Sequence, residues 1–217
     1  MLPNRLNLFR PPLFEEVLKA RIHAIVHEEI ERHLAPKGFS PAGDLKWVGD
    51  TDAPIRQVFE FRKWAGKVTP VWGLSLDFVP HISGKKAAWH RTNKSAKLDL
   101  CFDPGAGKLD MSCIAGEAPI RKQHKQIIAA AVREADHFWA RAAQAGDLPD
   151  LIDGLKDHYR TTDGLTFYSY KQHALATAFI LKHLGRDAEA LAELDRRHDP
   201  FWESEAWQNI RQLMTTA

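Results

Sequence analysis

The spacing of apolar residues changes twice along the chain, and these changes constrain the fold more than any single motif. From residue 13 to residue 34, apolar side chains recur every three or four positions, which predicts an amphipathic helix. From residue 45 to residue 114 the period is two, as in "IRQVFEF", "VWGLSLDFV" and "KLDLCF", which predicts strands. The last of these places Leu98, Leu100 and Phe102 on one face. After Pro119 the helical spacing returns.

These patterns predict an α+β fold. The alternating region is long enough for about five strands, and the turn residues of "WAGK" predict a hairpin, so we expect an antiparallel sheet. Because the strands are apolar on one face and polar on the other, helices should cover one face. We divide the chain into residues 1–118, a helix plus the sheet, and residues 119–217, a helical region packed on it within one compact unit.

The overall charge excludes a strongly basic or acidic protein. The chain of 217 residues has 30 basic and 28 acidic side chains, a net charge of +2, so nucleic-acid binding would need a local patch. The first residues, "MLPNRLNLFRPP", lack the apolar core of a signal peptide, and no window reaches the roughly 18 apolar residues of a membrane span. We therefore expect a cytoplasmic protein that does not enter a membrane.

The candidate binding region is a long basic segment, "VPHISGKKAAWHRTNKSAKL", at residues 79–98. It has one tryptophan, two histidines and five cations, with no acid between Asp77 and Asp99: Lys85, Lys86, Trp89, Arg91, Lys94 and Lys97 are its candidate contacts. Arg121 and Lys122 form a second basic cluster where the helix after Pro119 begins, and helix N-termini favour anions. The segment fits a nucleic-acid interface with Trp89 as a stacking platform, or a solvated, partly mobile connection, which we favour.

The stretch "HAIVHEEIERH" contains the candidate metal ligands His23 and His27. On a helix these two side chains and Glu31 lie one turn apart on the same side, and two such histidines can bind a divalent metal. The spacing differs from the H-E-x-x-H motif of zinc proteases, and no third ligand is evident. Ion pairs between His27 and Glu31 and between Glu28 and Arg32 explain the pattern better. We expect no cofactor.

The first helix and the strands after it resemble a bacterial family, domain of unknown function 4304, over about residues 13–115. The resemblance rests on "APKGF" after the helix, with the step Leu34, Gly38 and Phe39, and on the strands "VFEFRKW" and "VWGLSLDF". It implies an α+β fold and supplies no catalytic residues.

No complete catalytic motif is present, neither a Walker A nor a GxSxG sequence. We therefore expect a non-catalytic interaction or accessory protein, regulatory or immunity-like, that acts through a surface on a protein partner. The alternative is a binder of nucleic acid or another polyanion that uses residues 81–97. A metal-dependent enzyme built on His23 and His27 ranks last.

Overall fold

The computed structural model describes residues 12–49, 54–64, 67–83, 86–104, 109, 111–112, 117–161, 166–196 and 204–215. The predicted first helix is confirmed as α1 (Pro12–Leu34), followed by the short 3-10 helix η2 (Ala35–Lys37). Helices return after the strands, as the spacing predicted: α2 (Glu117–Ala140), η3 (Ala145–Asp147), α3 (Leu148–Thr161), α4 (Thr166–His183), α5 (Asp187–Arg196) and α6 (Ser204–Thr215).

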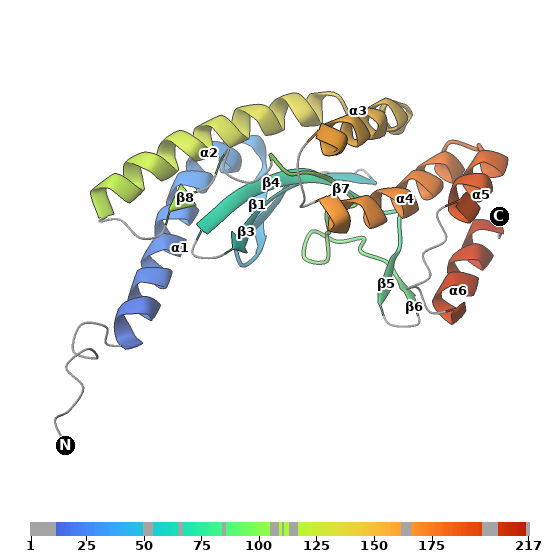
Figure 1. Ribbon diagram of the computed structural model, residues 1–217. Helices are drawn as coiled ribbons and strands as arrows, with labels where there is room; N and C mark the ends of the chain where they lie inside the picture. Colours follow the sequence, from blue (N-terminus) through green and yellow to red (C-terminus); the bar gives the residue numbers. More distant parts are fainter. Residues whose placement is uncertain are drawn as a thin grey trace, which may run out of the picture.

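The predicted antiparallel sheet of about five strands is confirmed (Figure 1). Its order is β1-β2-β3-β4-β7, with the short β8 also paired to β4. The bounds are β1 (Phe39–Gly43), β2 (Lys46–Gly49), β3 (Ile55–Trp64), β4 (Lys67–Leu76), β7 (Leu100–Phe102) and β8 (Met111–Ser112). The basic segment adds a separate hairpin, β5 (His81–Ser83) with β6 (Lys86–Ala88), which was not predicted.

Helices α1 and α2 cover one face of the sheet, as expected, and α2 lies above the sheet in Figure 1. Alternate residues of β3 and β4 point into this main core because successive side chains of a strand face opposite ways. The indole Nε1 of Trp139 on α2 donates a hydrogen bond of 2.9 Å to the carbonyl of Gly73. The buried residues that join sheet and helices include Val26, Ile30, Phe59, Phe61, Trp72, Leu74, Leu100, Ile128, Val132 and Trp139.

The second face of the sheet is also partly apolar, which the alternation did not predict. Val48, Val58 and Val71 form a smaller buried cluster there with Ala96, Leu98 and Cys101. The chain between β6 and β7 supplies part of this cluster and runs below the sheet in Figure 1. Our placement of Leu98 with Leu100 is therefore wrong, because β7 begins only at Leu100 and the chain before it is not part of the strand.

The C-terminal helices pack at the far end of β4. Gly185, with φ of 72°, ends α4 and leads into α5, and the two helices pack together. Phe78, just after β4, stacks on His183 of α4 with ring centroids 4.0 Å apart. Helix α4 also contacts α3 and β7, and α6 contacts β6. Among the described helices, none is both long enough and apolar enough to cross a membrane.

Replacing Gly73 by alanine should destabilise the fold strongly. A Cβ at this position would overlap the carbonyl oxygen of Leu100, a backbone atom of the paired strand that cannot move alone. We expect a loss of about 3 kcal/mol in the free energy of unfolding, measured by urea denaturation. Gly43→Ala is the matched control, since its Cβ would meet only the Lys46 side chain at 3.7 Å. Equal stability of the two variants would contradict the close approach of β7 to β4.

Candidate nucleic-acid interface

The basic segment is folded onto the sheet, and its cations Arg91, Lys94 and Lys97 are exposed to solvent. Side chains of the sheet hold its backbone at three points. Lys46 Nζ donates to the carbonyl of Ala96 at 2.9 Å, and Arg56 donates to the carbonyl of Arg91 at 2.9 Å. The backbone N–H of Lys97 donates to the Ser75 hydroxyl at 3.2 Å. Because these contacts add to the burial of Ala96 and Leu98, the segment forms an ordered part of the second face.

A buried hydrogen-bond chain fixes the same segment from within. Asp99 Oδ2 accepts hydrogen bonds from the backbone N–H of Leu76 at 2.7 Å and from His90 Nε2 at 2.6 Å. The other ring nitrogen of His90 lies 3.4 Å from Nδ1 of His81 on β5. Burial raises the pKa of Asp99, while the bond from His90 opposes that shift. The chain therefore links the end of β4 to the hairpin β5–β6.

Asp99 was missed as a functional residue by the sequence analysis. Its only sequence signal was an acid between two leucines in "KLDLCF". The other acid that flanks the segment, Asp77, forms an ion pair with the buried Arg56, and its carbonyl accepts from Arg91 Nε at 3.3 Å. Both flanking acids are thus paired within the fold and do not neutralise the cations at the surface.

The exposed residues of the segment form what we call the basic surface: Lys86, Trp89, Arg91, Lys94 and Lys97. Within the described part of the chain, none of its four cations forms an ion pair with an acid. Trp89 is 40% exposed, and no other large apolar side chain among the described residues is exposed. The guanidinium carbon of Arg91 lies 4.5 Å from the centroid of the Trp89 ring. The fifth predicted cation, Lys85, falls outside the described residues.

Two half-buried groups next to the basic surface respond to its charge. Burial lowers the pKa of Lys46, the negative charge of Glu60 opposes this shift, and the positive charge of Lys97 makes a smaller contribution that lowers the pKa. Burial also lowers the pKa of His81, and the positive charge of Lys97 lowers it further. Positive charge at Lys97 is therefore felt by its neighbours, as expected where no acid compensates it.

The second basic cluster lies apart from the basic surface. Arg121 pairs with Glu28 of α1 at 2.9 Å, while Lys122 is exposed. Helix α2 comes after β8 in the chain, and β8 pairs with the first residues of β4. Asp99 and His90, in contrast, lie beside the last residues of β4. A strand of ten residues spans roughly 30 Å, so the two clusters occupy different ends of the sheet (Figure 1).

The histidines of α1 do not gather around a common point. His23 Nδ1 lies 3.1 Å from Asp44, and His27 Nδ1 lies 3.7 Å from Glu31. Glu31 also accepts from the indole of Trp47 at 2.8 Å. The predicted ion pairs of His27 with Glu31 and of Glu28 with Arg32 are confirmed. No three histidine, cysteine or acidic side chains in the described parts of the chain are placed to hold a metal ion.

Comparisons with protein-family models, curated proteins and solved structures find no match for this chain. The resemblance to domain of unknown function 4304 therefore rests on the sequence pattern and stays a prediction.

Removing the Asp99 carboxylate should loosen the basic segment. Asp99→Ala leaves the N–H of Leu76 and the ring of His90 without their acceptor, so we expect a loss of about 3 kcal/mol in unfolding free energy. Amide hydrogen exchange in residues 89–98 should also become faster. Asp153→Ala, which breaks only an exposed pair with Lys156, is the control. Equal costs for the two variants would contradict the anchoring role.

The hydrogen-bond chain should make stability depend on pH through His81. Its folded pKa lies below the ordinary value of 6.5, so below about pH 6.5 the unfolded chain binds a proton that the folded chain resists. The free energy of unfolding should therefore fall as pH decreases, and His81→Gln should remove this component. We expect the stability of the wild type relative to this variant to decrease from about pH 7.5 to 5.5. A constant or rising difference would contradict the assigned environment of His81.

Proposed function

We propose that this protein is a non-catalytic binding protein whose basic surface recognises single-stranded nucleic acid. One observation supports the proposal: the segment that carries the exposed Trp89 also carries four exposed cations, none of which pairs with an acid among the described residues. Several basic side chains elsewhere pair with acids, as Arg121 does with Glu28, Arg186 with Glu189 and Arg211 with Asp195. Cations of this kind, held on an ordered segment, favour binding of the negatively charged phosphates of a nucleic-acid backbone.

The aromatic and cationic groups suit an unpaired nucleotide chain. Lysine and arginine side chains neutralise phosphates and release counterions, which supplies affinity without sequence preference. Unstacked bases pack on indole rings and on guanidinium planes, and Arg91 and Trp89 already lie against each other. Because the segment is held by the sheet, little conformational entropy remains to be lost on binding.

A polyanion fits the basic surface better than the protein partner that the sequence analysis favoured. The centres of protein–protein interfaces are apolar and depleted in lysine. Here Arg91 lies against the exposed Trp89, exposed lysines lie on the same segment, and no second large apolar side chain in the described residues extends the patch. We therefore retain the expected interaction protein and propose a polyanion, not a protein, as its partner.

Binding of a fluorescently labelled single-stranded oligonucleotide should depend on salt and on the basic surface. By fluorescence anisotropy, we expect the logarithm of the association constant to fall linearly with the logarithm of the salt concentration. Replacing Lys86, Lys94 and Lys97 by glutamine should reduce the slope by about 2, at roughly 0.7 per phosphate contact. Trp89→Ala should weaken binding about 5- to 150-fold if each stacked base contributes about 1–3 kcal/mol.

A matched triple variant separates a specific surface from general electrostatics. Glutamines at Lys122, Lys125 and Arg133 remove the same charge from exposed positions of α2. This variant should keep the wild-type slope to within about 1, the contribution of a single contact. An equal loss in both triple variants, or no binding at low salt, would contradict the proposal. If heparin binds equally well to the wild type and to Trp89→Ala, and no nucleic acid binds, the surface belongs to another polyanion.

A further inference from the structure

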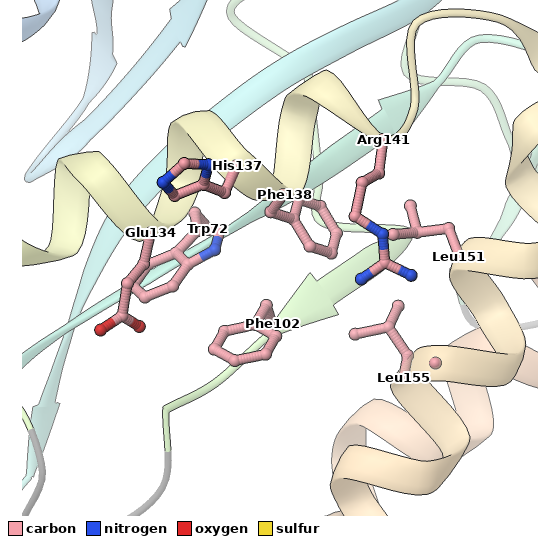
Figure 2. A pocket seen from close by; sticks show the side chains of 9 residues that line it. Trp72, Phe102, Glu134, His137, Phe138, Arg141, Leu151 and Leu155 are labelled. Carbon is pink, nitrogen blue, oxygen red and sulfur yellow. The ribbon is translucent and has the colours of Figure 1, made fainter.

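A separate pocket lies on the helix-covered side of the sheet, between β7, α2 and α3 (Figure 2). Its volume is about 240 Å³. Aromatic and aliphatic side chains form its walls, and polar residues of α2 stand at its edge. Its lining includes Trp72, Phe102, Glu134, Phe138, Arg141 and Gly154. The basic surface lies on the opposite face, so the two features can be tested independently.

The walls of the pocket present flat aromatic rings. Phe102 stacks on Trp72 with ring centroids 5.0 Å apart, and on His158 of α3 with centroids 4.3 Å apart. Phe138 of α2 lies against the same ring at 6.1 Å. The buried Nε1 of Trp72 has no hydrogen-bond partner among the described residues, although buried donors are normally paired. An aromatic ligand suits such walls, since stacked and edge-to-face rings attract.

Two unpaired charges flank Phe102. Glu134 lies on α2, and Arg141 is the residue directly after its last one, Ala140; Figure 2 shows the two side chains on opposite sides of the Phe102 ring. Neither side chain forms a hydrogen bond or ion pair with another described residue. A Cβ on Gly154 of α3 would lie only 3.1 Å from Nη2 of Arg141. The glycine therefore leaves the space in which the guanidinium lies beside the pocket.

We propose that this pocket binds a small aromatic carboxylate, with its ring packed among the aromatic side chains of the walls and its carboxylate paired with Arg141. Guanidinium groups bind carboxylates through two parallel hydrogen bonds, and Arg141 has its donors available. A cavity of about 150 Å³ holds benzene in another protein, so the volume of about 240 Å³ accommodates one ring with a short acidic side chain.

Phenylacetate is a suitable probe, because it has one ring and one carboxylate. Saturation-transfer NMR and calorimetry on the full chain should give a dissociation constant on the order of 0.1–1 mM. Phenylacetamide, with the same shape and no charge, should bind at least about tenfold more weakly. Arg141→Gln should weaken phenylacetate to the level of the amide and leave amide binding unchanged.

Two further variants keep the test decisive. Arg133→Gln removes the same charge from an exposed position of α2 and should bind phenylacetate as the wild type does. Gly154→Leu should abolish binding of both probes by filling the space beside Arg141. No saturation transfer at about 10 mM phenylacetate, some tenfold above the weakest constant expected, would overturn the proposal. Equal binding of acid and amide, or equal effects of the two arginine variants, would do so as well.

Discussion

The buried hydrogen bond between His90 and Asp99 is the interaction on which the second face of the sheet depends. Asp99 is the shared acceptor for His90 and for the backbone of Leu76, so one carboxylate joins the basic segment to the end of β4. A buried carboxylate is stable only with such partners, because burial disfavours its charge. Removing any partner would leave an unpaired polar group, which explains why the segment has one arrangement.

The sheet separates two surfaces of different chemistry. Its first face packs on α1 and α2, and the aromatic pocket forms at the edge of this packing, where α3 meets Phe102. Its second face is covered by the chain between β6 and β7, which buries Ala96 and Leu98 and exposes cations. A long connection therefore performs two tasks: its apolar residues close a small core, and its lysines, arginine and tryptophan are presented to solvent at fixed positions.

The long elements and the short strand β7 could be predicted from the sequence, whereas β1 and the hairpin β5–β6 could not. Strands β3 and β4, with ten residues each, show clear alternation, as α1 shows helical spacing. Hairpin β5–β6 and β1 are too short for a period to emerge, and β1 contains Pro41. The cations of the candidate site were visible as a charge pattern. Their placement depends on Lys46, Ser75 and Asp99, distant contacts that no local pattern encodes.

We propose that nucleic acid binds the basic surface without rearranging the segment that carries it. Titrating isotope-labelled protein with a single-stranded oligonucleotide, while recording backbone amide and indole N–H resonances by NMR, tests it most directly. We expect progressive shifts confined to the amide resonances of residues 86–97 and of the hairpin β5–β6, and to one indole N–H resonance. The absence of that indole resonance from the spectrum of Trp89→Phe would assign it to Trp89. Shifts concentrated at the start of α2, or an unchanged Trp89 indole at saturation, would contradict it.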